Sequence, residues 1–166
     1  MTIIRRADTT PTEHALQAPW LESVTVPAGA ALLFVSGQIP PVADARYGLE
    51  DRRAYGNMET QTLGVLERLD AKLRAAGFTL GDIVKLTAFL VGEEEFAGRP
   101  DLEGFGRAYR RFFGTADQPH LHARTRVQVA SLMNPAWLVE IEAVAAASKS
   151  DAAPTGPPLQ EGEQTS

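Results

Sequence analysis

The chain has 166 residues, no cysteine and a net charge of −5 at pH 7. A chain of this length typically forms one domain, and without thiols it has no disulfide scaffold, cysteine nucleophile or cysteine metal site. The acidic balance argues against binding to nucleic acid or an anionic membrane. No apolar run approaches the roughly 18 to 20 residues of a membrane span. The N-terminus also lacks the apolar core of a signal peptide, so we expect a cytoplasmic protein.

Composition divides the chain into a folded part and a tail. Residues 148–166 are rich in proline, glycine, serine and acidic residues, with almost nothing apolar to bury. Such a segment is typical of disorder. We therefore predict a single domain over residues 1–147, with the first 12 or so residues loosely attached, followed by a disordered tail.

The N-terminal half begins with short strands. A weak strand pair is predicted around residues 14–18 and 22–26. The apolar run ALLFVSGQ (31–38) ends near a glycine and predicts a buried strand. Residues 40–56 carry prolines and glycines and predict a polar loop.

A helix and a long strand follow this loop. Asn57 is placed to cap a helix that runs to Ala76, with leucines recurring at three- and four-residue spacing and Gly77 ending it. Residues 82–92, DIVKLTAFLVG, are rich in β-branched and aromatic residues and predict a strand.

The C-terminal half repeats the alternation. An apolar stripe at helical spacing predicts a second helix over residues 102–113, ended by Gly114. Strands are predicted at residues 122–131 and 137–147. Two helices cannot cover both faces of such a sheet, so we predict an α+β fold with both helices on one face of a mixed sheet. We expect the other face to pack against further copies of the chain.

Charged residues on the last two strands are the strongest chemical signal. In HARTRVQV (122–129), strand alternation places Arg124 and Arg126 on one face. In the last strand Glu140 and Glu142 also share a face. One interpretation is structural, with the arginines and glutamates paired across the sheet. The other is an anion site, in which an arginine holds a carboxylate and a glutamate positions water.

Two further features are weaker signals. In SGQIP, Gly37 follows the buried strand and leaves its backbone open to a small ligand. His120 and His122 lie two residues apart, but no third ligand stands at a recognisable spacing, so we expect no metal site. No phosphate-binding loop, dinucleotide fingerprint or nucleophile elbow is present.

Several stretches together resemble the reactive intermediate deaminase family, also called the Rid or YjgF-like family. They are FVSGQIP (34–40), QTLGVLERLDAKLRAAGFTLGDIVKLTAFLVG (61–92), YRRFF (109–113), HARTRVQVASL (122–132) and VEIEAVA (139–145). The resemblance implies a chorismate-mutase-like fold that assembles as a homotrimer with clefts between subunits. It also implies hydrolysis of reactive 2-imino or enamine acids, such as 2-iminobutanoate and 2-iminopropanoate, to 2-keto acids and ammonia, without a metal or organic cofactor.

The resemblance assigns roles to three residues. Arg124 matches the family's carboxylate-binding arginine, Glu140 matches its water-positioning glutamate, and Gly37 matches the glycine whose backbone contacts the ligand. These matches favour the anion-site interpretation. We accordingly expect a small carboxylate as the partner of this chain.

The surroundings of the site depart from the family pattern. We expect Ser36, Arg126 and Tyr109 to contact the substrate as well, with Arg126 replacing a small residue and adding a second positive charge. Gly106 replaces a family asparagine. The tyrosine that closes over the ligand has no counterpart in HALQAPW, where Trp20 is the candidate substitute. A dicarboxylate or a larger imino or enamine acid is therefore conceivable as substrate.

A second function stays open beside the enzymatic one. A trimer that captures a small carboxylate as a sensor or regulator would keep Arg124 and need no turnover. A ribonuclease activity, also attached to relatives, is disfavoured by the acidic balance and by the lack of a basic and aromatic surface.

Overall fold

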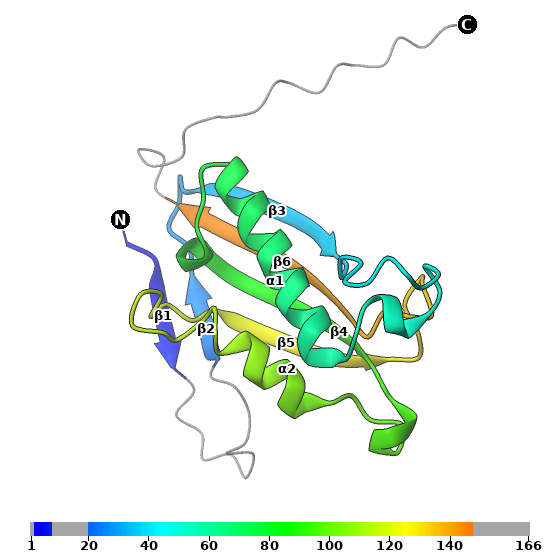
Figure 1. Cartoon of the computed structure of the whole chain (residues 1–166). Coiled ribbons are helices and arrows are strands. Elements are labelled where there is room, and N and C mark those ends of the chain that lie inside the picture. The colour runs from blue at the N-terminus through cyan, green and yellow to red at the C-terminus, as the bar shows by residue number, and fades with distance from the viewer. Residues whose placement is uncertain (1, 8–19, 148–166) are drawn as a thin grey trace, which may run out of the picture.

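The computed structural model describes residues 2–7 and 20–147 of the chain. A six-stranded sheet carries two helices on one face (Figure 1). The strands are β1 (Ile4–Ala7), β2 (Leu21–Thr25), β3 (Ala31–Gln38), β4 (Ile83–Val91), β5 (Ala123–Val129) and β6 (Val139–Ala147). The helices are α1 (Met58–Ala75) and α2 (Leu102–Tyr109). The predicted α+β class, with both helices on one face, is confirmed.

The strand order in the sheet is β1-β2-β5-β4-β6-β3. β5 pairs in parallel with both β2 and β4, and the remaining neighbours are antiparallel. β4 therefore separates β5 from β6, although β5 and β6 are consecutive along the chain. This insertion decides where the charged side chains of β5 and β6 come to lie.

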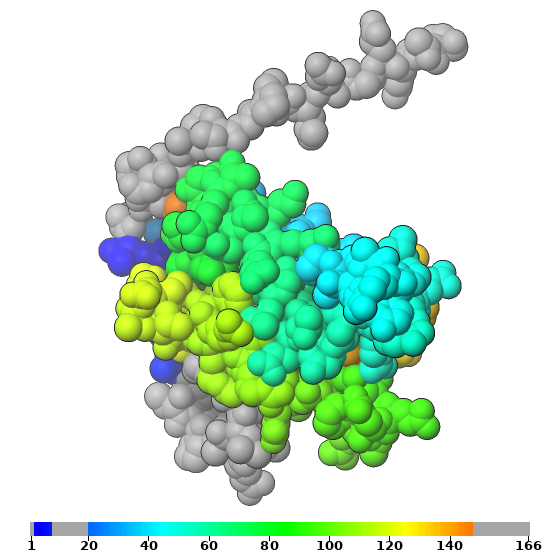
Figure 2. Space-filling view, in the orientation of Figure 1, coloured from blue at the N-terminus to red at the C-terminus, as the bar shows by residue number. Residues whose placement is uncertain are grey.

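The core lies between the sheet and the helices. Alternate residues of β4 and β6 point into it, as expected for strands with one covered face. The apolar stripe of α1 packs onto them, and in Figure 2 the helix-covered side forms a continuous surface over this core. The core side chains that are fully shielded from solvent include Met58, Leu66, Leu69, Leu73, Leu86, Leu90, Phe105, Tyr109, Leu138 and Ile141.

The ends of α1 follow the predicted capping. The Asn57 side-chain oxygen accepts a hydrogen bond from the Thr60 amide at 3.0 Å. Gly77, with φ 79°, takes the left-handed conformation that ends the helix. These local signals were sufficient to place both ends of the helix within a residue.

The second helix is shorter than predicted. α2 ends at Tyr109, and the amides of Arg111 and Phe112 bond to carbonyls three residues back, so the chain tightens into turns before Gly114. Leu102, predicted to lie on the apolar stripe, is 46% exposed. The cause is its position in the first turn, at the margin of the helix–sheet contact.

The N-terminal segment adds an edge strand that the sequence did not predict. We expected the first 12 or so residues to be loosely attached, yet residues 4–7 pair antiparallel with β2. Arg5 ties this strand down, since its guanidinium donates to the carbonyls of Gly81 at 2.7 Å, Ile83 at 3.0 Å and Leu121. The predicted strand at 14–18 and the predicted tail lie outside the described residues.

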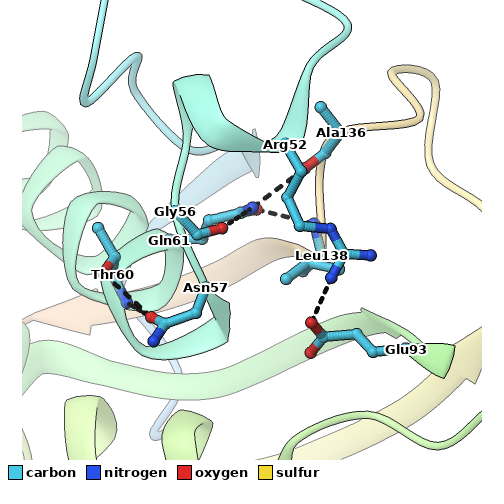
Figure 3. Close-up of polar contacts among 8 residues, drawn as sticks. All are labelled: Arg52, Gly56, Asn57, Thr60, Gln61, Glu93, Ala136 and Leu138. Atoms are coloured by element: carbon cyan, nitrogen blue, oxygen red, sulfur yellow. Dashed lines mark hydrogen bonds and ion pairs between the residues drawn. The ribbon is translucent and has the colours of Figure 1, made fainter. Parts of the chain in front are cut away.

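A buried amide joins the loops that flank α1 and β6 (Figure 3). The Gln61 side-chain nitrogen donates to the carbonyls of Gly56 and Ala136, each at 3.0 Å, and its oxygen accepts from the Leu138 amide at 2.7 Å. Gln61 is 1% exposed, so its three hydrogen bonds replace water for otherwise orphaned backbone groups. Nearby, Arg52 pairs with the buried carboxylate of Glu93.

In the part of the chain that the structure describes, no helix is long and apolar enough to cross a membrane.

Candidate functional site

Two arginines of β5 lie against aromatic rings of α2. The Arg124 guanidinium carbon is 4.6 Å from the centre of the Tyr109 ring, and that of Arg126 is 5.7 Å from the centre of the Phe105 ring. The spacings match, because residues i and i+2 of a strand are about 6.6 Å apart and residues i and i+4 of a helix are about 6 Å apart along its axis. Cation–π contact therefore orders both guanidinium groups side by side.

A pocket of about 500 Å³ opens beside these arginines. The described residues that line it are Trp20, Leu90, Arg99, Pro100, Leu102, Arg124, Arg126, Val127 and Gln128. Three of them are arginines and none is an aspartate or glutamate, so the pocket favours an anionic ligand. The Trp20 ring lies 5.5 Å from the Arg124 guanidinium carbon, on the pocket side.

Arg124 keeps its positive charge although its side chain is partly buried. Desolvation lowers the pKa of Arg124 to about 10, helped by the neighbouring charge of Arg126 and opposed by Tyr109. A group with this pKa is fully protonated at neutral pH. Arg124 therefore offers a poorly hydrated, oriented guanidinium, the form in which a bidentate carboxylate contact is strongest.

Gly37 and Glu140 meet on the opposite, helix-free face of the sheet. Val35 of β3 pairs with Ala143 and Gln38 with Ile141, so β3 holds one residue more than β6 at this point, and the bulge contains Gly37. The Glu140 carboxylate packs directly over the glycine: a Cβ built on Gly37 would lie 1.9 Å from Glu140 Oε1. A glycine is needed here because the carboxylate occupies the space of a side chain.

Ser36, also in the bulge, is exposed and lines a hollow of about 390 Å³ on the same helix-free face. This face also carries large exposed apolar side chains, with Leu32 at 51%, Phe34 at 74% and Val127 at 39%. The predicted site residues Gly37, Ser36 and Glu140 thus form one group on this face.

Within one chain, the arginines Arg124 and Arg126 are separated from the group formed by Gly37, Ser36 and Glu140. In the register of the sheet, Arg124 is level with Leu86 and Glu140 with Phe89, on either side of β4. Two interstrand spacings across the sheet, combined with three residues along the strands, place the Cα atoms of Arg124 and Glu140 about 14 Å apart. Their side chains point to opposite faces of the sheet. The alternative that the arginines and glutamates pair across the sheet is therefore wrong, because the strands are not neighbours.

The structure places Tyr109 behind Arg124 and outside the pocket. Tyr109 is fully buried and is not among the described residues that line the pocket, and its contact with a substrate stays a prediction. The two histidines also separate: His120 is exposed, while His122 is buried against Tyr109. Among the described residues no three acidic, histidine or cysteine side chains cluster as a metal site.

Sequence reasoning missed one charged residue of the pocket. Arg99 lines it from the turn before α2, and it stands in a loop whose position no local pattern predicts. The turn is held against β5 by the Gln128 side chain, which donates to the Gly98 carbonyl at 2.7 Å. Trp20, named as a candidate substitute, does lie in the pocket.

Comparison with known proteins agrees with this fold. The family model described as Endoribonuclease L-PSP matches residues 12–147. A RutC family protein of Pyrococcus horikoshii is 34% identical over 134 residues, covering 81% of this chain and 93% of the relative. TdcF of Escherichia coli K12, whose name assigns it provisionally to the reactive intermediate deaminases, is 31% identical over 130 residues, covering 78% of this chain and 88% of TdcF.

Solved structures give the same result. The crystal structure of E. coli TdcF with bound serine has a TM-score of 0.54 and 28% identity, covering 87% of this chain and 94% of that one. The structure of the E. coli YjgF gene product has a TM-score of 0.53 and 30% identity, covering 77% and 87%. The chain therefore belongs to the endoribonuclease L-PSP (YjgF/RutC/Rid) family, which confirms the resemblance found in its sequence.

Proposed function

We propose that this protein is a cofactor-independent deaminase that hydrolyses reactive 2-imino or enamine carboxylic acids to 2-keto acids and ammonia. The observation that carries the proposal is the partly buried, ring-supported guanidinium of Arg124 at the wall of a pocket rich in arginine. Such a group suits a bidentate grip on a carboxylate. Serine bound to the relative TdcF supports a ligand of amino-acid size.

The chemistry needs positioning more than activation. Arg124 holds the substrate carboxylate and so fixes the adjacent imine carbon. Water held by Glu140 adds its oxygen to that carbon and its protons pass to the nitrogen, after which the C–N bond breaks and ammonia leaves with the keto acid remaining. An imine is already electrophilic, so orientation and a modest electrostatic contribution are sufficient.

A complete site then needs two copies of the chain. Arg124 and Glu140 lie on opposite faces of one sheet, about 14 Å apart between Cα atoms, which exceeds the reach of a small imino acid. A cleft between subunits, with Arg124 from one chain and Glu140 from the next, would bring them together. The exposed Leu32 and Phe34 on the helix-free face suit such packing, and we propose a homotrimer as the assembly.

Arg126 is proposed to extend the same grip. Its guanidinium lies beside that of Arg124 in one pocket, so a second carboxylate or another polar group on the substrate could be bound. The competing function is a trimer that binds a small carboxylate without turnover. It uses the same pocket, and measured turnover separates it from the enzyme.

The direct test measures ammonia and keto-acid release from 2-imino acids generated in situ by an amino-acid oxidase. Wild type should accelerate release, and Arg124→Ala should abolish the acceleration. Arg111→Ala, which removes an exposed arginine outside the pocket, is the matched control and should retain activity. Carboxylate binding through Arg124 without acceleration of any imine would favour the binding trimer, and full activity of Arg124→Ala would refute the assigned role.

The two-chain site has its own test. Arg124→Ala and Glu140→Gln should each be inactive alone, whereas co-expression should produce mixed trimers that regain activity. If each site takes one group from each of two neighbouring chains, random assembly of equal amounts leaves about a quarter of the sites intact. A mixture as inactive as its components would contradict a site shared between chains.

A further inference from the structure

A buried histidine lies directly behind the proposed carboxylate grip. His122 immediately precedes β5, is fully shielded from solvent, and has its Nε2 atom 2.9 Å from the Tyr109 hydroxyl. Its ring meets those of Tyr109 and Phe113 edge to face, with centres 5.7 and 4.6 Å apart. Its Nδ1 atom is buried with no hydrogen-bond partner among the described residues. Burying a histidine with one ring nitrogen unpaired costs stability, so packing alone does not account for a histidine at this position.

The surroundings of His122 keep it neutral. Burial lowers its pKa to about 3, and the charges of Arg124 on β5, Arg5 on β1 and Lys85 on β4 act in the same direction. Burial raises the pKa of Tyr109 to about 12, opposed by the nearby positive charge of Arg124. A neutral phenol therefore meets a neutral imidazole.

Tyr109 contacts His122 and Arg124 with different parts of its side chain. Its hydroxyl is hydrogen-bonded to His122 Nε2 at 2.9 Å, and its ring lies against the Arg124 guanidinium, whose carbon is 4.6 Å from the ring centre. A buried hydrogen bond at the end of the side chain restricts the ring, and the ring face in turn sets the plane in which the guanidinium stacks. His122 therefore acts on Arg124 through the Tyr109 ring.

We propose that Tyr109 and His122 are positioning residues that fix the orientation of the Arg124 guanidinium, so that carboxylate binding depends on a histidine that does not line the pocket. The inference rests on the proposed function only in taking Arg124 as the carboxylate-binding group. It predicts that both residues act on ligand binding as one unit. They would affect KM more than kcat, because the carboxylate is held alike in ground and transition states.

The test is calorimetric binding of pyruvate to the full-length protein, supported by KM and kcat with imino acids. Tyr109→Phe keeps the ring under Arg124 and removes the hydroxyl, and His122→Phe removes the hydrogen-bond partner of that hydroxyl. Each should raise the Kd about tenfold, the loss expected when one hydrogen bond that orients a charged group is broken. The double variant should bind no worse than either single variant. His122→Gln, whose amide can accept at the position of Nε2, should restore most of the affinity.

Four outcomes separate the possibilities. Non-additive losses with rescue by His122→Gln would support the positioning role of Tyr109 and His122. A Kd within twofold of wild type for Tyr109→Phe, while Arg124→Ala abolishes binding, would overturn the positioning role and leave the proposed function intact. Multiplicative losses would likewise overturn it, because they mean independent structural effects. Unchanged binding in Arg124→Ala would instead refute the proposed function. If His122→Phe fails to fold, Tyr109→Phe still tests the same hydrogen bond: a tenfold loss supports the proposal, and a Kd within twofold of wild type overturns it.

Discussion

Replacing Gly37 with alanine should damage function far more than stability. The new Cβ would lie 1.9 Å from Glu140 Oε1, 2.8 Å from Cδ and 3.0 Å from Cγ, whereas ordinary contacts begin near 3.4 Å. The carboxylate must therefore shift by about 1.5 Å, and displacements of about 1 Å can reduce a rate by roughly 10²-fold. We expect kcat/KM to fall by about that factor.

The folded state should tolerate the same change. Gly37 does not have a positive φ, and the clashing atoms belong to the end of a flexible side chain that can swing aside. Alanine also restricts the unfolded chain, so the free energy of unfolding should stay within about 1 kcal/mol of wild type. Gly48→Ala is the matched control, because no atom lies within 4 Å of its Cβ and its φ is not positive.

The assay combines imine hydrolysis with denaturant unfolding in wild type, both glycine variants and Glu140→Ala. If Gly37→Ala acts through the carboxylate, it should cause no further loss when added to Glu140→Ala. Activity of Gly37→Ala near that of wild type would refute the reasoning, as would an additional loss in the double variant.

The remaining predictions concern stability. Gln61→Ala should lower the free energy of unfolding by about 3–5 kcal/mol, because it leaves two carbonyls and one amide of the protein interior without partners. As the control, replacing the exposed Glu67 of the same helix with alanine should change the free energy of unfolding by less than about 0.5 kcal/mol. Equal losses in the two variants would contradict the role of Gln61. His122, whose folded pKa of about 3 lies below its ordinary 6.5, binds a proton more readily when unfolded, so its contribution is present above pH 6.5 and is lost on acidification. The loss should approach about 1.4 kcal/mol per pH unit below 6.5 in urea unfolding, and it should be missing in His122→Gln; parallel pH profiles of the two proteins would show that His122 is not the cause.

Much of the fold follows from local patterns. The helix that begins after Asn57 and ends before Gly77 is specified by its cap, its apolar spacing and its terminator, all of which act within one or two turns. β3, β4 and β6 are recognisable from apolar and β-branched runs because such segments suit a half-buried pleated surface. β1 escaped prediction because its four residues gain their stability from Arg5 bonds to distant carbonyls.

The candidate site likewise depends partly on local sequence and partly on tertiary structure. The sequence by itself determined which residue types stand where: alternation put Arg124 and Arg126 on one face of their strand, and Gly37 at a strand end. Only the tertiary structure decided what they meet. Inserting β4 between β5 and β6 separated Arg124 from Glu140 and turned them to opposite faces, and the β3 bulge set Gly37 under the Glu140 carboxylate. Strand order and register depend on contacts between residues far apart in the chain, so no local pattern encodes them.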